Sequence, residues 1–398
     1  MNESGEYSSP QRLLPVSMET LVVIVGALLL AGAIGTEQSW WDRHFLPVFF
    51  FSHDKYVLGE RLARLVCGMV GAALIFFIRP MIGRLARRMP ARELAAGTAR
   101  IALAIGLALV ASELVLDRHF AFAAAERQDQ EEPLRQPDPK LGWVFAPARV
   151  GQTIVGGRTI AYAIDPRGYR VPDRKTAVNT SSPTILFTGE SIIAGYGLNW
   201  NETIPAQVGA SLGIQSANMA VFGYANDQAF LRLAAELPRF RQPVAVVSLF
   251  IPSLFVRNLG DDRPHLDPEF GWKPAIHRLW LSSLFRFFVP YHSDTEIKRG
   301  IQATDAVLAA TAAMARKRGA IALVVDPQFG PEGPTEQTLR RRILDQPGIA
   351  YVRVVLDPNW HLKGDLHPDP RAAHAIAMAI AARLKADLAR RADARDTR

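Results

Sequence analysis

The chain carries a serine and a histidine–aspartate pair in settings that can support nucleophilic catalysis. An apolar run, Thr184–Thr188, is interrupted by Gly189-Glu190-Ser191, and a glycine-punctuated turn follows. This pattern is typical of a buried parallel strand that delivers a serine to the carboxyl edge of a sheet, where open α/β folds place their chemistry. A serine hydroxyl becomes a useful nucleophile only when a base removes its proton. Asp365-Leu366-His367-Pro368, directly before the last long helical pattern, can supply that base.

Each of these residues also has an ordinary structural interpretation. Ser191 could simply cap the helix that follows it, and a histidine next to proline suits a common turn. His374, on the last helix, is expected to be packed or exposed rather than catalytic, and His361 and Asp357 are nearby substitutes for the proposed pair. No cluster of His, Cys and carboxylate residues has metal-ligand spacing, and no glycine-rich phosphate loop is present in the sequence. We therefore expect neither a metal nor a cofactor.

Strands and helices alternate from Pro183 onward. Short apolar strands joined by helices predict an α/β fold with a parallel sheet covered on both faces. The predicted strands are 184–188, 214–219, 244–250, 321–325 and 351–355, and the predicted helices are 204–212, 228–237, 301–318, 335–344 and 371–388. Pro252–Tyr291 breaks this rhythm, because it is long and rich in aromatic residues. It is predicted to be either a lid or binding wall, or a satellite hydrophobic cluster with one or two short helices.

The N-terminal third has a different character. The hydrophobic content of 49% is high for a wholly soluble protein, and the excess lies before residue 117. Three apolar stretches stand out, Leu21–Gly35, Leu62–Ile78 and Ile101–Leu116, each a little shorter than the roughly 20 residues that span a bilayer. Any one of them could be a buried soluble helix, but three in a row predict a membrane domain of about three transmembrane helices over residues 1–117. Residues 44–53 are too short to span and are expected to lie at the interface or to re-enter.

The orientation of the predicted spans follows from the arginines. Residues 79–100 hold six arginines and one glutamate, and thus five of the eight net positive charges of the chain. A short basic loop stays in the cytoplasm, which places the N-terminus inside and everything after Leu116 on the periplasmic or extracellular side of a bacterial inner (plasma) membrane. The acidic leader predicts that the first span is not a cleaved signal peptide. Because little positive charge remains for the globular part, no nucleic-acid partner is expected despite a pI of 9.8.

Residues 118–182 are predicted to be a linker and a small β element. Arg127–Pro139 is polar, charged and proline-containing, as linkers are. Short alternating pieces at 152–155 and 159–164 and a turn at 165–168 then indicate short strands that lead into the main domain.

The second half of the chain resembles the SGNH (GDSL-type) hydrolases. Gly189-Glu190-Ser191 is similar to their first block, usually Gly-Asp-Ser, and Asn218–Asp227 is similar to their second block, whose glycine donates a backbone N–H to the oxyanion. That role maps onto Gly223. Asp365–His374 resembles the last block, which carries the acid and the base. The resemblance covers about half of the chain and implies a flavodoxin-like parallel-sheet catalytic domain over residues 183–398.

The sequence departs from the family pattern in two places. The third block normally supplies an asparagine to the oxyanion hole, whereas the corresponding strand 244–250 runs into Ile251-Pro252-Ser253 with no asparagine at the expected place. Asn258, six residues beyond Pro252, is the candidate to fold back. The acid and base of the family are usually three residues apart, whereas Asp365 and His367 are two apart.

The resemblance implies a Ser-His-Asp acyl-enzyme mechanism. Ser191 attacks an ester carbonyl, His367 takes and returns the proton, and Asp365 orients the imidazole. The N–H groups of Ser191 and Gly223 receive the oxyanion, with Asn258 as a further candidate.

The expected function is that of a membrane-anchored extracytoplasmic serine esterase, or an O-acyltransferase or deacetylase, acting on cell-envelope or secreted polysaccharide. Transferase activity would require a multi-span membrane partner to supply the acyl group, since three spans are too few to move an acyl donor across the membrane. The alternatives are a lipid or small-ester hydrolase, and a non-catalytic SGNH-like protein that binds glycan or acts as a scaffold. Ser191 Oγ within hydrogen-bond reach of His367 would favour the enzyme.

Overall fold

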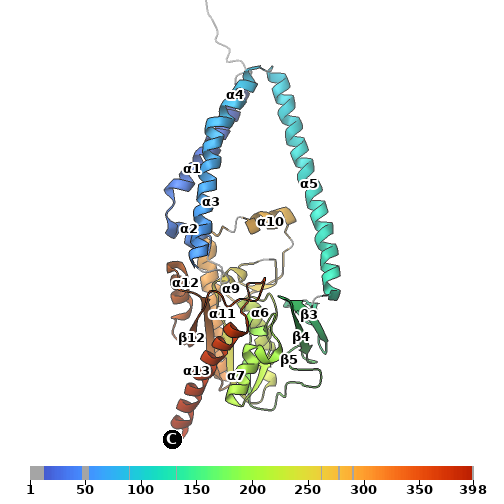
Figure 1. The fold of residues 1–398 in the computed structure, drawn as a ribbon, viewed down its shortest axis with the longest axis vertical. Helices are drawn as coiled ribbons and strands as arrows, with labels where there is room; N and C mark the ends of the chain where they lie inside the picture. Colours follow the sequence, from blue (N-terminus) through green and yellow to red (C-terminus); the bar gives the residue numbers. More distant parts are fainter. Residues whose placement is uncertain are drawn as a thin grey trace, which may run out of the picture. The chain divides into compact units, whose positions relative to one another are not determined.

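The computed structural model describes residues 13–46, 53–88, 90–130, 132–260, 262–276, 278–288 and 291–396. The chain forms two compact units. A helical unit holds Met1–Arg43, Asp54–Ala121 and Leu279–Pro290, and an α/β unit holds His44–His53, Phe122–Arg278 and Tyr291–Arg398. Figure 1 labels some of the elements of both units. The chain passes between the two units several times, so they are not consecutive in the sequence.

The helical unit contains two helices that are long and apolar enough to cross a membrane, Asp54–Leu85 and Ala95–Phe120. A third span is present only if Glu19–Gly35 and Gln38–His44, which meet at a bend of 107°, count as one. The structural elements of this unit are α1 (Leu13–Gly35), α2 (Gln38–His44), α3 (His53–Ala73), the π-helical turn η2 (Leu74–Ile78), α4 (Arg79–Arg88), α5 (Ala91–Gln130) and α10 (Trp280–Phe288). The predicted number of three spans is therefore an upper limit, and the described part of the predicted segment 44–53 gives no span of its own.

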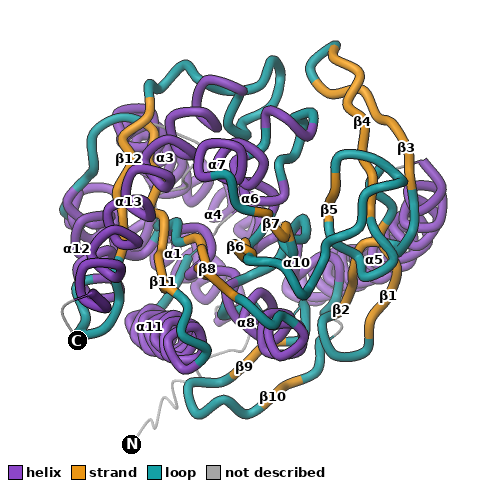
Figure 2. Tube along the Cα trace, turned by 90° about the horizontal axis from the view of Figure 1, so that it is seen from below, coloured by secondary structure: helices purple, strands orange, loops and turns teal. Residues whose placement is uncertain are grey.

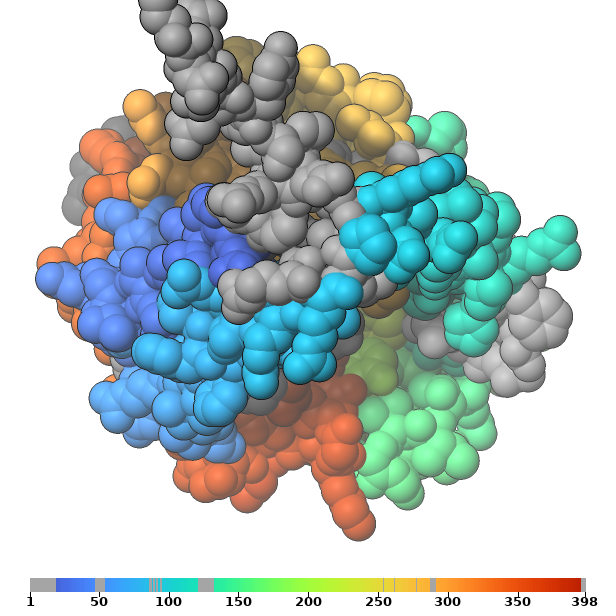
Figure 3. Space-filling model, turned by 90° about the horizontal axis from the view of Figure 1, so that it is seen from above, coloured from blue at the N-terminus to red at the C-terminus, as the bar shows by residue number. Residues whose placement is uncertain are grey.

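Large apolar side chains cover the surface of these helices. Leu62, Met69 and Phe76 are more than half exposed, as are Leu103 and Leu107 on α5. Atoms of the N-terminal helices are seen at the surface in the space-filling view (Figure 3, blue and cyan). Exposed aliphatic surface on this scale is typical of helices that face lipid. The predicted basic loop 79–100 is largely helical, because α4 extends to Arg88 and α5 begins at Ala91.

Helix α10 belongs to the helical unit although its sequence lies between elements of the α/β unit. The Glu113 carboxylate of α5 accepts hydrogen bonds from the backbone N–H groups of Trp280 (2.6 Å) and Leu281 (2.9 Å), and so satisfies two free donors at the N-terminus of α10. The Trp280 ring stacks on Phe120, with 4.3 Å between ring centroids. The aromatic segment 252–291 is thus divided, since α9 (Pro252–Arg257), β9 (His265–Leu266) and β10 (Trp272–Lys273) stay in the α/β unit.

The α/β unit is built on an eight-stranded sheet of order β12-β11-β8-β6-β7-β5-β4-β3. Five strands are parallel: β6 (Thr184–Phe187), β7 (Gln215–Asn218), β8 (Pro243–Leu249), β11 (Ile321–Phe329) and β12 (Tyr351–Leu356). The sheet is mixed, because β3 (Val150–Val155), β4 (Arg158–Ile164) and β5 (Arg170–Val171) extend it with antiparallel pairing. The small β element, predicted to pack on or lead into the main domain, therefore extends the main sheet itself. Strands β1 (Arg135–Asp138) and β2 (Gly142–Phe145) form a hairpin apart from this sheet.

Helices cover both faces of the parallel strands (Figure 2). Helices α7 (Ile204–Leu212) and α13 (Pro370–Asp396) pack together on one face, and α8 (Asn226–Glu236) and α11 (Asp294–Lys317) pack together on the other. The remaining helical elements are α6 (Ser191–Ala194), α12 (Pro334–Leu344) and the 3₁₀ turns η3 (Trp200–Glu202) and η4 (Leu237–Arg239). Because both faces are covered, every residue of β6 is buried, which explains its unbroken apolar run.

The order of the parallel strands determines where chemistry is expected. Numbered along the chain, they lie in the order 2-1-3-4-5, the flavodoxin-like arrangement, in which the chain switches direction between the first and third strands. These two strands are β6 and β8. Ligands of open α/β sheets bind outside the carboxyl ends of the strands at this switch point, which is where Ser191 follows β6.

Candidate active site

Ser191 is the first residue of α6, four residues after Phe187, the last residue of β6. Gly189 makes the turn with φ of +152°, a backbone conformation that side-chain-bearing residues rarely adopt. The helix is capped by Glu190, whose carboxylate accepts from the backbone N–H of Ile192 at 2.9 Å. Ser191 is therefore not the cap residue, and its side chain is available for other contacts.

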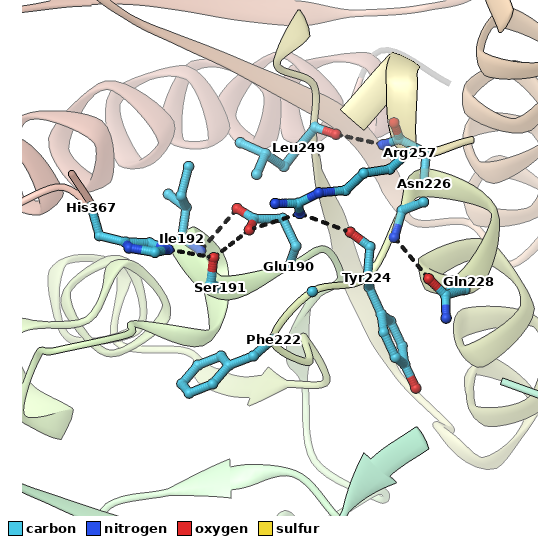
Figure 4. Close-up of polar contacts among 12 residues, drawn as sticks. Glu190, Ser191, Ile192, Phe222, Tyr224, Asn226, Gln228, Leu249, Arg257 and His367 are labelled. Atoms are coloured by element: carbon cyan, nitrogen blue, oxygen red, sulfur yellow. Dashed lines mark hydrogen bonds and ion pairs between the residues drawn. The ribbon is translucent and has the colours of Figure 1, made fainter. Parts of the chain in front are cut away.

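The structure brings Ser191, His367 and Asp365 together from positions far apart in the sequence. Ser191 Oγ lies 2.8 Å from His367 Nε2 (Figure 4), and His367 Nδ1 lies 2.6 Å from Asp365 Oδ1. His367 is on the loop before α13, which packs against the sheet. The arrangement is that of a nucleophile, a base and a group that orients the base.

Asp365 holds the imidazole through one oxygen atom. Its Oδ1 accepts both from His367 Nδ1 and from the backbone N–H of His367, the latter at 2.8 Å. The short spacing of two residues makes this double contact possible, because the loop turns back on itself between them. The hydrogen bond from the His367 ring lowers the pKa of the Asp365 carboxyl below its usual value. Asp365 is thus ionised and can stabilise a positively charged imidazole.

Two backbone N–H groups are available to an oxyanion. Neither the Ser191 N–H nor the Gly223 N–H has a hydrogen-bond acceptor within the part of the chain that the structure describes. Gly223 has φ of +79°, and a Cβ atom there would lie 3.2 Å from the Trp143 ring. The Trp143 Nε1–H donates to Phe222 O at 2.8 Å. Because this oxygen and the Gly223 N–H belong to one planar peptide, Trp143 fixes the direction in which the Gly223 N–H points.

Asn258 has a different role from the one predicted for it. It is 2% exposed, and its Oδ1 accepts from the backbone N–H groups of Asn226 (3.0 Å) and Asp227 (3.4 Å) at the start of α8. Its Nδ2 donates to Thr304 Oγ1 at 2.6 Å. Asn258 therefore ties α9 to α8 and α11, and its side chain is not directed to the oxyanion.

Glu190 and Arg257 are site residues that the sequence analysis did not identify. Glu190 Oε2 accepts a hydrogen bond from Ser191 Oγ, so the hydroxyl lies between two acceptors, His367 Nε2 and this carboxylate. A hydroxyl has only one proton to donate, so it can donate to only one of these two acceptors at a time. Arg257 Nη1 lies 3.5 Å from the same carboxylate oxygen (Figure 4). Glu190 occupies the place of the aspartate in the Gly-Asp-Ser motif. The motif therefore indicates where Glu190 lies, but not that its carboxylate contacts Arg257.

Arg170 supports the site from the antiparallel part of the sheet. Its fully buried guanidinium donates to the carbonyls of Ala194 (2.7 Å), Gly195 (2.6 Å) and Leu198 (2.5 Å), which form the loop after Ser191. Burial lowers its pKa to about 10, so it remains charged at neutral pH. In the sequence this residue falls within the predicted small β element, and no local pattern indicates that it reaches the serine loop.

The other candidate residues lie outside the Ser191–His367 contact. His361 Nδ1 contacts Leu366 O at 2.8 Å, Asp357 caps a turn through Asn359 N, and His374 is exposed and contacts Gln207. Among the described residues, no group of three or more His, Cys, Asp or Glu side chains can hold a metal ion.

Comparisons with known proteins find likeness only at the level of structure. No family model matches the chain, and neither does any curated protein. Solved structures to which the chain is similar include carbohydrate esterases and GDSL-type lipolytic proteins. An acetyl xylan esterase from Butyrivibrio proteoclasticus is 14% identical with a TM-score of 0.34, over 54% of this chain and 66% of that one. An esterase from Pseudoalteromonas sp. is 15% identical with a TM-score of 0.34, over 52% and 98%. A member of the lipolytic protein G-D-S-L family from Veillonella parvula is 11% identical with a TM-score of 0.28, over 50% and 96%.

Proposed function

We propose that this chain is a membrane-anchored serine esterase of the SGNH type, acting on acyl esters of a cell-envelope or secreted polysaccharide. The observation that carries the proposal is the Ser191 Oγ to His367 Nε2 distance of 2.8 Å, with His367 Nδ1 held by Asp365 at 2.6 Å. A protein that only binds glycan has no need for this chain of contacts. The geometry therefore favours an enzyme over a scaffold.

In the proposed reaction, Ser191 Oγ forms a bond with the ester carbonyl carbon while its proton passes to His367 Nε2. The carbonyl electron pair moves onto oxygen, where the N–H groups of Ser191 and Gly223 receive it. The tetrahedral intermediate then collapses, and the leaving alcohol takes the proton from His367. A second alcohol or a water then gives its proton to His367 and attacks the acyl carbon, and the Ser191 oxygen leaves and takes this proton back from His367. Transfer and hydrolysis differ only in which of these two molecules attacks.

The helical unit supports a location at a membrane. Helices Asp54–Leu85 and Ala95–Phe120 are long and apolar enough to span one, with exposed aliphatic surfaces. The six arginines between residues 79 and 100 favour a cytoplasmic position for that turn, so the α/β unit would face the periplasm or the cell exterior of a bacterium. In that position it meets envelope polysaccharide, and acyl transfer would need a multi-span partner as the source of the acyl group.

The test uses the full-length chain in detergent. We expect it to react with a fluorophosphonate serine probe and to turn over p-nitrophenyl acetate, and both properties should vanish in Ser191→Ala. Ser181→Ala, at an exposed serine, is the matched control and should retain both. Release of acetate from an acetylated polysaccharide then tests the glycan substrate.

Two results would contradict the proposal. A folded wild-type chain that neither reacts with the probe nor hydrolyses the ester would leave a glycan-binding role. Hydrolysis of lipid or small esters with no release from any acetylated polysaccharide would favour the alternative of a general lipid esterase.

A further inference from the structure

Arg257, at the C-terminal end of α9, lies between the two segments that carry the backbone oxyanion donors. Its Nη1 is 3.5 Å from Oε2 of Glu190, the residue before Ser191, and 3.3 Å from the carbonyl oxygen of Tyr224, the residue after Gly223. Figure 4 shows the side chain extending from its helix toward the Glu190 carboxylate and Ser191. The guanidinium is therefore adjacent to both halves of the proposed oxyanion hole.

The Arg257 guanidinium has N–H groups that could donate to a bound substrate. Both of its contacts use Nη1, and its Nε and Nη2 N–H groups have no acceptor in the part of the chain that the structure describes. The side chain is 27% exposed, so a bound substrate can reach it. Arg263, on the following segment, differs in this respect, since its Nε, Nη1 and Nη2 already donate to Asp262 and to Gly223 O.

The site also requires a positive charge at this place. The Glu190 carboxylate is 1% exposed and contacts Ser191 Oγ, so it lies close to where negative charge develops on the substrate carbonyl oxygen. Like charges repel strongly in a buried setting. A cation beside the carboxylate, such as the Arg257 guanidinium 3.5 Å from Glu190 Oε2, offsets this repulsion.

We propose that Arg257 is a catalytic residue that donates a guanidinium N–H to the oxyanion, in addition to the backbone N–H groups of Ser191 and Gly223. This rests on the proposed esterase function. When Ser191 Oγ bonds to the carbonyl carbon, the electron pair displaced onto oxygen gains a third, charged donor. The segment after β8 thus supplies the donor through Arg257, whereas the adjacent Asn258 is used to hold α8. An interaction made mainly in the transition state raises kcat and leaves KM nearly unchanged.

The experiment compares full-length wild type, Arg257→Met and Arg257→Lys in detergent. The kcat and KM for p-nitrophenyl acetate and the inhibition constant of phenylboronic acid, which forms a tetrahedral adduct with an activated serine, are measured for each. Arg316→Met is the matched control, because Arg316 also donates to a backbone carbonyl, that of Gly348, at the opposite edge of the sheet. We expect Arg257→Met to lower kcat by about 100- to 1000-fold, with KM changed less than threefold and boronate affinity lost in parallel with kcat. Arg257→Lys should lie in between, and the control should match wild type.

A double variant separates the donor role from simple neutralisation of Glu190. If Arg257 only offsets this carboxylate, Glu190→Gln in the Arg257→Met background restores kcat, and the proposal is refuted. If Arg257 contacts the oxyanion, the double variant stays slow while added ethylguanidinium partly rescues Arg257→Ala. Equal kcat in Arg257→Met and the control also refutes it, provided that wild type labels with the fluorophosphonate. A wild type that does not label refutes the esterase function itself, and this inference with it.

Discussion

Asp365→Asn should reduce activity far less than the loss of the carboxylate would suggest. In the wild type a single atom, Oδ1, accepts both the His367 Nδ1–H and the His367 backbone N–H. An asparagine oxygen in the same place can accept both bonds. The opposite orientation of the amide would put its NH₂ against the backbone N–H, donor against donor, so the backbone keeps the oxygen where it is needed. The productive tautomer of His367, with the proton on Nδ1, is then preserved.

What remains is the loss of the charge that stabilises the imidazolium. Two unit charges roughly 4 Å apart interact by about 4 kcal/mol at an effective dielectric constant near 20. The side chains of His367 and Asp365 are 21% and 28% exposed, so we discount this by half, to about 2 kcal/mol, for solvent screening. That corresponds to a roughly 30-fold lower kcat. Asp365→Ala also frees the ring and leaves the backbone N–H unpaired, and should cost about 10³- to 10⁴-fold.

The assay is p-nitrophenyl acetate turnover by full-length wild type, Asp365→Asn and Asp365→Ala at pH 8, with thermal unfolding as a check on folding. The rate of fluorophosphonate labelling gives an independent measure of the reactivity of Ser191. An Asn variant as slow as the Ala variant would show that the amide has turned and that the double contact does not control the tautomer.

Three further changes test other parts of the structure. Trp143→Phe keeps an aromatic ring, though a smaller one, and removes the donor to Phe222 O. We therefore expect kcat to fall about tenfold and the free energy of unfolding to fall by about 1 kcal/mol, measured by ester turnover and urea unfolding. Arg170→Met leaves three loop carbonyls without their donor and should lower the free energy of unfolding by roughly 3 kcal/mol. It should also slow the labelling of Ser191 by the fluorophosphonate probe. Burial raises the pKa of Asp326 to about 7, so the native state binds this proton more tightly than the unfolded chain, and wild-type stability should fall as pH rises from about 4 to about 7. Asp326→Asn should remove this pH dependence and be more stable than wild type at pH 8 by about 2 to 4 kcal/mol. Urea unfolding of both proteins at pH 5 and pH 8 measures this difference. Equal unfolding midpoints at pH 8 would show that ionised Asp326 does not destabilise the wild type.

The sequence predicts the parts of the fold that local patterns encode. An apolar run buried on both faces predicts β6, and the glycine and serine after it predict the turn that carries Ser191. The helix at 204–212 coincides with α7, because a threonine cap and a following glycine mark its ends. Helix α11 begins earlier than predicted, at Asp294, since Ser293 and Glu296 form a capping box before the first apolar residues.

Long-range side-chain contacts are not encoded in this way. Arg170, Arg257 and Asn258 carry side chains whose targets lie on other elements, and spacing along the chain gives their positions but not their directions. Asn258 was a further candidate for an oxyanion donor, yet its side-chain oxygen accepts from the backbone N–H groups of Asn226 and Asp227 at the start of α8. The strands β3–β5 were expected to pack on or lead into the main domain, and their place in its sheet was not predicted, because nothing local indicates that β5 pairs with β7 through Arg170 and Asn218.

Helix α10 makes the α/β unit of this protein difficult to isolate. Trp280, the first residue of α10, is held by Glu113, Asp117 and Phe120 of α5. In the α/β unit, Leu46 packs with Phe255. A chain shortened to begin near residue 117 would leave the Trp280 face without Glu113 and would open the space that Leu46 fills. A soluble form for crystallisation therefore requires more than an N-terminal truncation. Residues 279–290 would be replaced by a polar linker, and the segment around Leu46 would be kept or the space that Leu46 fills would be filled by larger side chains.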